Sequence, residues 1–227
     1  MALIEKLIKE GYLKTPRIIE AFKKIKRVDF LPDDMKDLSE LNEALPIDYG
    51  QTISQPLVVA FMLELLEPKK GEKILDIGSG SGWTSALLAE IVGERSLPAG
   101  RQGKIIAIDI VPELVKFGKK NVGEYNFLKK GIVEFVCADG SKGYEKEAPF
   151  DKILVSATLA AAKGGKEDLS SLTTATKVPD SWKKQLKVGG RIVAPIGTSI
   201  WLFVKKSKTE FEQMEYPGFV FVPLISK

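Results

Sequence analysis

The chain has 227 residues, 44% of them hydrophobic and 28% charged, which is enough to bury one substantial core. Its formal net charge of +4 is too small and too scattered to favour a nucleic-acid partner. No apolar run approaches the roughly 20 residues of a membrane span. The opening MALIEKLIKE carries charges where a signal peptide needs an apolar region. We therefore expect a cytoplasmic monomer with no membrane partner and no stable nucleic-acid partner.

The chain contains one cysteine and no histidine, and this restricts its chemistry. A disulfide framework, zinc held by histidine and every mechanism with an imidazole base are excluded. The lone Cys137 falls inside an apolar run, which predicts a buried structural thiol.

Apolar residues at helical spacing predict two amphipathic helices within residues 1–30, the second opened by Pro16. We expect both helices to pack on a later sheet. A polar, turn-rich passage then leads to GQTISQP at 50–56, directly before a third predicted helix at 57–66. Ser54 can cap this helix or present its hydroxyl to a ligand, and the residues alone favour the cap, the commoner role of a serine at that position.

The stretch ILDIGSGSGW, residues 74–83, is an apolar strand followed by a glycine turn, and helical spacing resumes after it. Glycines permit positive φ and leave no Cβ in the way of a ligand, so such a turn can seat a nucleotide. A dinucleotide fingerprint reads GxGxxG, whereas here the spacing is GxGxG and Trp83 stands in place of the last glycine. The pattern favours S-adenosylmethionine over NAD or FAD.

Two further strands end in carboxylates. Residues 104–108 are closed by Asp109, a position suited to ribose hydroxyls, although it lies further from the glycines than the usual roughly 20 residues. We attribute the excess to a surface loop at 95–102. Asp139, after the strand 132–137, would face the same crevice and could accept a hydrogen bond from an adenine amino group. For both aspartates, a simple turn role is the alternative.

Alternating strands and helices predict an α/β fold: a doubly wound, Rossmann-like sheet, mostly parallel with one antiparallel edge strand, preceded by an N-terminal helical addition. This arrangement is typical of S-adenosylmethionine methyltransferases. Residues 187–190 are expected to stop a helix and turn, and residues 159–176 fit neither period and are expected to form a mobile insertion. The remaining predicted elements are strands at 151–156, 190–195, 199–205 and 218–224 and helices at 112–121 and 180–186.

Motifs spread over residues 27–224 resemble, in order, the protein-L-isoaspartate (D-aspartate) O-methyltransferase family. The TISQP motif at that distance before the glycine turn is specific to this family. The segments that carry the resemblance are GQTISQP (50–56), LDIGSGSG (75–82), ADG (138–140), APFD (148–151), QLKVGGR (185–191) and FVPL (221–224).

The resemblance implies a repair enzyme that uses S-adenosyl-L-methionine, releases S-adenosyl-L-homocysteine, and methylates the α-carboxylate of L-isoaspartyl and D-aspartyl residues in damaged proteins and peptides. It makes Ser54 the active-site residue, with the amides of residues 52–54 holding the substrate carboxylate. A carboxylate with a pKa near 4 is already ionised, so no base is needed. The residues implied to bind cofactor are Gln51, Thr52, Ile53, Asp76, Gly78, Ser79, Gly80, Gly82, Asp109, Ile110, Asp139 and Gly140.

We expect one domain over 1–227, with helices and the active-site loop in 1–56 and the cofactor-binding core in 57–227. The segments 95–102 and 159–176 are longer than the family pattern.

One alternative function is that of a nucleic-acid methyltransferase of the same fold, but the amine-binding Pro-Pro-Tyr-like motif is missing after the fourth strand. A second alternative is a non-catalytic S-adenosylmethionine-binding or scaffold protein, whose site is blocked by the insertion at 159–176. A dinucleotide oxidoreductase is the third, and Trp83 argues against it.

Overall fold

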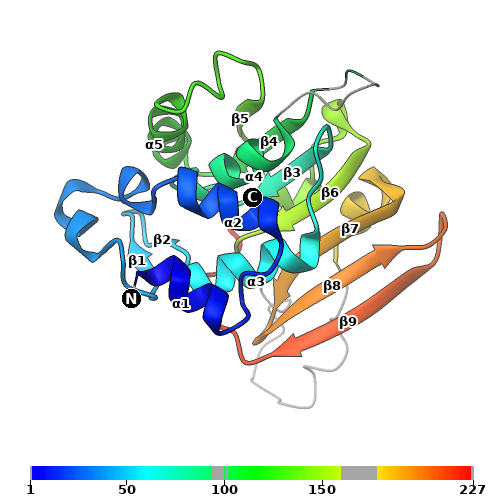
Figure 1. Cartoon of the computed structure of the whole chain (residues 1–227). Coiled ribbons are helices and arrows are strands. Elements are labelled where there is room, and N and C mark those ends of the chain that lie inside the picture. Colours follow the sequence, from blue (N-terminus) through cyan, green and yellow to red (C-terminus); the bar gives the residue numbers. More distant parts are fainter. Residues whose placement is uncertain (1, 94–99, 101, 160–177, 226–227) are drawn as a thin grey trace, which may run out of the picture.

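The computed structural model describes residues 2–93, 100, 102–159 and 178–225. Within them a seven-stranded sheet runs in the order β5-β4-β3-β6-β7-β8-β9 (Figure 1). The strands from β5 to β7 pair in parallel, whereas β8 is antiparallel to both β7 and β9. The predicted Rossmann-like sheet is therefore confirmed. The strands are β3 (Lys73–Ile77), β4 (Lys104–Asp109), β5 (Val133–Cys137), β6 (Phe150–Val155), β7 (Leu186–Ile196), β8 (Ser199–Lys205) and β9 (Phe211–Pro217).

The outer strand of the sheet differs from the prediction. Residues 218–224 do not form a strand. The last strand, β9, precedes them, and they run instead across the carboxyl ends of the parallel strands. The antiparallel strand β8 consequently lies one position in from the edge. The sequence of β9, FEQMEYP, is polar and mostly exposed, so it lacks the apolar alternation that predicts a strand. Apart from Gly100, Gln102 and Leu159, the predicted insertions at 95–102 and 159–176 lie outside the described residues.

The predicted turn at 187–190 is wrong, because β7 begins at Leu186 directly after helix α6 (Asp180–Gln185). The glycines lie within the strand, where Gly189 has a φ of 81°. The pairing with β6 shifts register between Phe150 and Lys152, which is how the irregular segment is accommodated. The glycines that we interpreted as the signal for a helix C-terminus therefore belong to an irregular segment of a strand.

Cys137 is exposed, and the predicted burial is wrong. The residue ends β5, which is the outermost strand on its side of the sheet, so one flank of its strand has no neighbour. Its thiol lies 3.8 Å from the carbonyl oxygen of Ile110.

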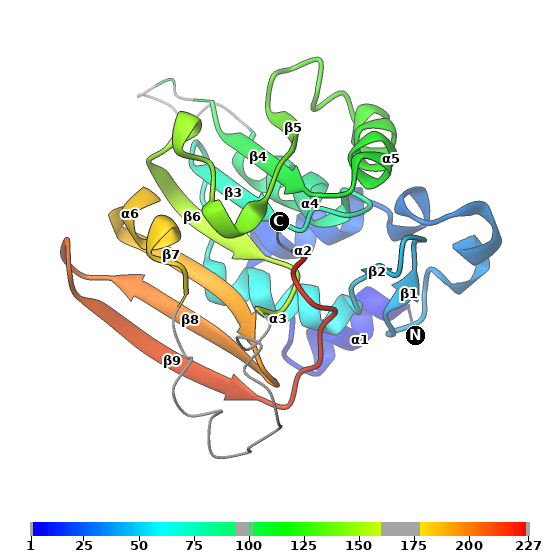
Figure 2. The ribbon, with the colours of Figure 1, turned by 180° about the vertical axis from the view of Figure 1, so that it is seen from behind.

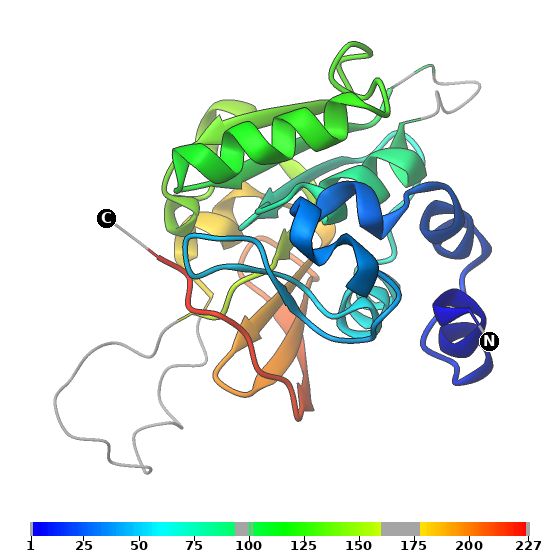
Figure 3. The same ribbon diagram turned by 90° about the vertical axis from the view of Figure 1, so that its left-hand side faces the viewer.

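Helices cover the two faces unequally. The helices α3 (Pro56–Leu66), α4 (Trp83–Val92) and α5 (Pro112–Gly123) cover one face, and α6 packs on the other (Figure 2). The N-terminal helices α1 (Leu3–Lys9) and α2 (Pro16–Lys24) form an outer layer, visible in Figure 3. In the described part of the chain, no helix combines the length and apolar character needed to cross a membrane.

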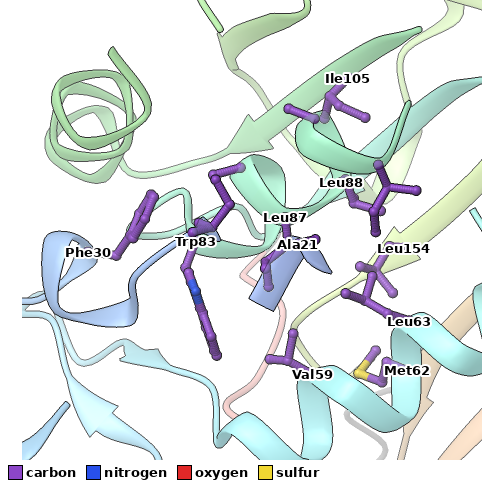
Figure 4. Close-up of a cluster of buried hydrophobic side chains, with 14 of the residues drawn as sticks. Ala21, Phe30, Val59, Met62, Leu63, Trp83, Leu87, Leu88, Ile105 and Leu154 are labelled. Atoms are coloured by element: carbon purple, nitrogen blue, oxygen red, sulfur yellow. The ribbon is translucent and has the colours of Figure 1, made fainter. Parts of the chain in front are cut away.

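The N-terminal helices rest mainly on other helices, which corrects the expectation that they pack on the sheet. Helix α2 packs against α4 and α3, and Lys24 Nζ lies 2.6 Å from the Glu90 carboxylate of α4. Figure 4 shows how side chains from these helices and from β4 and β6 meet. Residues labelled there include Ala21, Val59, Leu63, Trp83, Leu87, Ile105 and Leu154, and all of them are buried.

Several short segments complete the fold. They are the hairpin of β1 (Leu45–Pro46) and β2 (Thr52–Ile53) and the 3₁₀ turns η1 (Arg27–Phe30), η2 (Asp33–Leu38), η3 (Gly140–Lys142) and η4 (Glu145–Glu147).

Helix α5 approaches the glycine turn through a glycine of its own. A Cβ built on Gly118 would lie 3.0 Å from the carbonyl oxygen of Gly80 and 2.7 Å from the Phe135 ring. Asn121, one helical turn further on, donates from Nδ2 to the Ser81 carbonyl at 3.0 Å. The absence of a side chain at Gly118 therefore sets the distance between α5 and the turn.

We expect Gly118→Ala to lower the free energy of unfolding by about 1–3 kcal/mol, because the added methyl group overpacks this contact. Gly123→Ala is the matched control in the same helix, since a Cβ there meets only Leu128 Cδ1, at 3.8 Å. Glycine is intrinsically unfavourable in helices, so the control should be neutral or slightly stabilising. Urea unfolding of both variants measures the difference, and equal effects would contradict the packing argument.

Asp76 lies in the central strand β3 with its side chain fully buried toward α4, where it accepts a hydrogen bond from Ser85 Oγ at 2.6 Å. Burial raises the pKa of Asp76 to about 7. Its unfolded pKa is about 3.9. Between those two values the folded chain keeps a proton that the unfolded chain releases, so stability falls as pH rises.

Replacing Asp76 by Asn removes this titration. We expect the stability of the wild type relative to Asp76→Asn to decline from pH 4 to pH 7 and to level off above pH 7. Unfolding curves of both proteins across this range test the linkage. A difference that stays constant with pH would show that the Asp76 pKa is the same in the folded and unfolded states.

Candidate active site

Two adjoining cavities lie at the carboxyl ends of the parallel strands, near the point where the chain order reverses between β3 and β6. The serine cavity, of about 40 Å³, is lined by Gln51, Thr52, Ile53, Ser54, Gly78, Ser79, Gly80, Ser81, Trp83, Thr84, Asp109, Ser156, Ala157 and Val222. The strand-end cavity, of about 30 Å³, is lined by Gln51, Ile77, Gly78, Ile108, Asp109, Ile110, Val111, Ala138, Gly140, Ala157, Pro223, Leu224 and Ile225.

The glycine turn forms the floor shared by the two cavities. Gly78 and Gly80 have φ values of 78° and 49°, in the region that favours glycine, and both leave main chain open to the cavity. Between them Ser79 is 5% exposed, and its Oγ has no hydrogen-bond partner among the described residues. A buried hydroxyl that lines a cavity and lacks a partner is a ready contact for a polar ligand.

Asp109, at the end of β4, joins the turn to the neighbouring strand and borders both cavities. Its Oδ2 accepts a hydrogen bond from the Gly80 amide at 2.9 Å, and Oδ1 accepts one from the Val111 amide at 3.0 Å. Burial raises the pKa of this carboxyl, and the amide hydrogen bonds act in the opposite direction. A carboxylate accepts about four hydrogen bonds, so Asp109 retains acceptor capacity for a hydroxyl donor.

The β1–β2 hairpin brings the serine-bearing segment over the glycine turn. Ile47 Cδ1 lies only 3.2 Å from the position that a Cβ on Gly80 would occupy, so the hairpin rests directly on that glycine. The hairpin tip contains three successive positive-φ residues, Asp48, Tyr49 and Gly50. It reverses the chain so that Gln51 and the residues after it enter the cavity.

Ser54 does not cap α3. The N-cap position is held by Gln55, which makes no side-chain cap hydrogen bond. The Asn42 carboxamide oxygen instead accepts a hydrogen bond from the Leu57 amide at 2.9 Å. Ser54 is half-buried and lines the serine cavity, which leaves the alternative of a ligand-facing hydroxyl.

Three of the predicted site residues line neither cavity. Asp76 points toward α4, because alternate residues of a strand face opposite sides of the sheet. Gly82, with a φ of 85°, lets the start of α4 pack on Val122. The Asp139 Oδ1 accepts hydrogen bonds from the amide and hydroxyl of Ser141, so this carboxylate supports the turn that was its alternative role.

Several lining residues were not predicted. Ser156 and Ala157 follow β6, and the rule that ligands bind beyond the carboxyl ends of strands could have found them. Residues 222–225 were missed because 218–224 were assigned to a strand, although the FVPL motif at 221–224 was a signal that could have found most of them. They are attached through hydrogen bonds from the Thr158 amide to the Val222 carbonyl and from the Leu224 amide to the Thr158 carbonyl.

The two cavities are small. Pockets for drug-sized ligands typically measure roughly 300 Å³ or more, so the walls must separate to admit a nucleoside. The segment 222–225 borders both cavities and is held to Thr158 by the two hydrogen bonds given above, so a displacement of this segment would enlarge both cavities.

Comparison with known proteins places this arrangement in a family. A family model described as Protein-L-isoaspartate(D-aspartate) O-methyltransferase matches residues 1–227. A protein-L-isoaspartate O-methyltransferase of Methanopyrus kandleri is 37% identical over 229 residues, covering 99% of this chain and 90% of the relative. Another, from Archaeoglobus fulgidus, is 38% identical and covers 98% and 90%.

A solved structure from Plasmodium falciparum, in complex with S-adenosyl-L-homocysteine and bearing the same family designation, superposes with a TM-score of 0.78. It covers 99% of this chain and 97% of the other at 20% identity, so it shows the shared fold. The full-length family match and these two relatives together establish that this chain belongs to the protein-L-isoaspartate (D-aspartate) O-methyltransferase family.

Proposed function

We propose that this protein transfers the methyl group of S-adenosyl-L-methionine to the α-carboxylate of L-isoaspartyl and D-aspartyl residues in damaged proteins. The observation that carries the proposal is that two segments distant in the sequence line one cavity. The serine-bearing segment, residues 51–54, and the glycine turn, residues 78–81, line the same space. A methyl acceptor and a methyl donor can meet there.

The residues around the glycine turn fit this cofactor. Gly78 and Gly80 leave main chain open to the cavity, and Asp109 offers carboxylate oxygens for ribose hydroxyls. Ser79 offers a hydroxyl that has no partner in the part of the chain that the structure describes. Ile110 and Gly140 border the strand-end cavity where an adenine would lie. We retain Asp139 as a proposed adenine contact, since its neighbours Ala138 and Gly140 both line that cavity.

Bound S-adenosylmethionine supplies an electrophilic methyl group on its sulfonium. The isoaspartyl carboxylate is ionised at neutral pH and needs no base, in keeping with a chain that has no histidine. The protein's contribution is positioning, which at its best lowers a barrier by roughly 7–11 kcal/mol. We assign this task to the Ser54 hydroxyl and the amides of residues 52–54, which hold the carboxylate in line with the methyl group.

In the product, the adjoining main-chain amide nitrogen attacks the methyl ester and expels methanol, which gives a succinimide. Hydrolysis of the succinimide by water yields normal aspartate in part, so the reaction repairs aged proteins. We further propose that the chain acts in the cytoplasm as a monomer with a single domain over 1–227. No feature of the cavities favours a nucleic-acid acceptor over a peptide carboxylate.

We expect labelled methyl from S-adenosylmethionine to enter an isoaspartyl peptide and not its normal aspartyl twin, and the label to be base-labile as methyl esters are. Equal labelling of both peptides would contradict the proposed acceptor. Cofactor binding without any transfer would point to another acceptor or to a non-catalytic role.

We expect Ser54→Ala to lower kcat/KM for the isoaspartyl peptide by about 10²-fold, if the hydroxyl behaves like a lost oxyanion donor. The unfolding free energy should change by less than about 0.5 kcal/mol, because Ser54 caps no helix. Steady-state kinetics with urea unfolding measures both. If Ser54→Ala instead keeps its activity and loses stability, as the removal of a helix cap would cause, the assigned role of Ser54 is contradicted.

We expect Asp109→Asn to weaken binding of S-adenosylhomocysteine by about tenfold or more. Both Asp109 oxygens accept amide hydrogen bonds, so an asparagine NH₂ in either position faces another donor. Calorimetric titration measures the dissociation constant. Asp33→Asn, on a side chain that is 96% exposed, is the control and should bind like wild type. Unchanged affinity in Asp109→Asn would remove Asp109 from the cofactor site.

A further inference from the structure

Arg27, the first residue of η1, is buried although it lies outside the two cavities. Its guanidinium hydrogen bonds, among the described residues, all go to main-chain carbonyls. Nη1 donates to Ser39 at 3.3 Å and Leu41 at 2.9 Å, and Nη2 donates to Glu43 at 2.6 Å and Ser54 at 3.3 Å. One side chain therefore ties residues 39–43 to the backbone of the proposed active-site serine.

The burial of this cation is costly, as its pKa shows. Burial lowers the pKa of Arg27 to about 10, and the charge of Glu40 opposes that effect. A buried cation is tolerated when its donors are well used. Here its acceptors are carbonyls of a loop, so the hydrogen bonds restrain the backbone positions of residues that have no regular secondary structure.

Arg27 also contacts the glycine side of the site. Its Cζ lies 5.5 Å from the centroid of the Trp83 ring, within the range of a cation–π contact. Trp83 begins α4 directly after Gly82 and lines the serine cavity. Arg27 thus touches the segment that bears the serine and the helix that follows the glycine turn.

The position of the guanidinium depends on these contacts more than on close packing. Arg27 and Trp83 both line a separate cavity of about 100 Å³. Arg27 Nε and Trp83 Nε1 lack hydrogen-bond partners among the described residues. The carbonyl hydrogen bonds and the ring contact therefore define where the guanidinium lies, and a planar fork with several donors is needed to make them together.

We propose that Arg27 is a positioning residue for methyl transfer, which holds the backbone of Ser54 in register with the glycine turn. The inference rests on the proposed function for its kinetic consequence. A lysine at this position keeps the charge but cannot span four carbonyls of two segments, so Ser54 would lose its restraint while the cofactor contacts at the turn remain.

The test is Arg27→Lys, assayed with the isoaspartyl peptide. We expect a raised KM for the peptide and a lowered kcat, with kcat/KM reduced about 10- to 100-fold, because small misplacements have effects of this size. S-adenosylhomocysteine should bind with its affinity within about threefold of wild type and at one site per folded chain. Arg27→Gln should behave similarly or worse, since it removes the charge as well.

Arg191→Lys is the matched control. Arg191 donates from Nη1 to the Leu65 carbonyl at 2.7 Å and pairs with Glu67 at 2.9 Å, at the opposite end of α3 from Ser54. This variant should lose stability without a change in the peptide KM. The proposal would be overturned if Arg27→Lys left KM unchanged and lowered kcat only in proportion to the number of S-adenosylhomocysteine sites per chain. That result would show that the variant merely contains fewer folded molecules, which is a purely structural role.

Amide hydrogen exchange decides the question independently of the acceptor. Arg27→Lys should speed exchange at residues 53 and 54 at least about tenfold while leaving the central strand β4 protected. Unchanged exchange at these residues would overturn the positioning role. A wild type that transfers no methyl to isoaspartyl peptide would count against the proposed function, and the exchange result would still decide the role of Arg27.

Discussion

The hydrogen bond from the Gly80 amide to the Asp109 carboxylate holds the site together. It links the turn after β3 to the end of β4, so the glycine turn is fixed relative to two adjacent strands of a parallel sheet. Helix α5 supports the same turn from outside through Gly118 and Asn121, and the β1–β2 hairpin rests on Gly80 from the other side. In each contact a neighbouring element approaches the main chain of the turn closely, which is why glycine and short polar side chains are concentrated here.

The sequence predicted well those parts of the fold that follow from local periodicity. The strands β3 and β4 and the helices α3, α4 and α5 are apolar runs or amphipathic repeats bounded by clear signals, and they formed near the expected bounds. The errors concern edges and context. The strand β9 is polar because it lies at the sheet edge, Cys137 is exposed because β5 lies at the other edge, and Gly189 lies within a strand. An isolated sequence does not tell which strand lacks a neighbour.

The candidate site was predicted to a similar degree. Gly78 and Gly80 carry a pattern that depends on a single strand, turn and helix, and Asp109 ends the next strand; all three line the cavities as expected. Asp76 was placed with them by the family resemblance, but the alternation of side chains along β3 turns it toward Ser85. The role of Ser54 depended on whether another residue caps α3. Asn42 supplies that cap to the Leu57 amide from 15 residues earlier in the chain, and only the folded structure reveals this contact. The support from Arg27 is likewise invisible in the sequence, since its partners are main-chain carbonyls.

The account requires donor and acceptor to meet between the hairpin and the glycine turn, in a space that must widen to hold them. The most direct measurement is a crystal structure with S-adenosylhomocysteine and an isoaspartyl peptide bound together. The account predicts the cofactor along residues 78–80 with its ribose on Asp109, the segment 222–225 displaced outward, and the isoaspartyl α-carboxylate within hydrogen-bonding distance of Ser54 Oγ. A peptide carboxylate bound away from Ser54, with the cofactor in place, would contradict it.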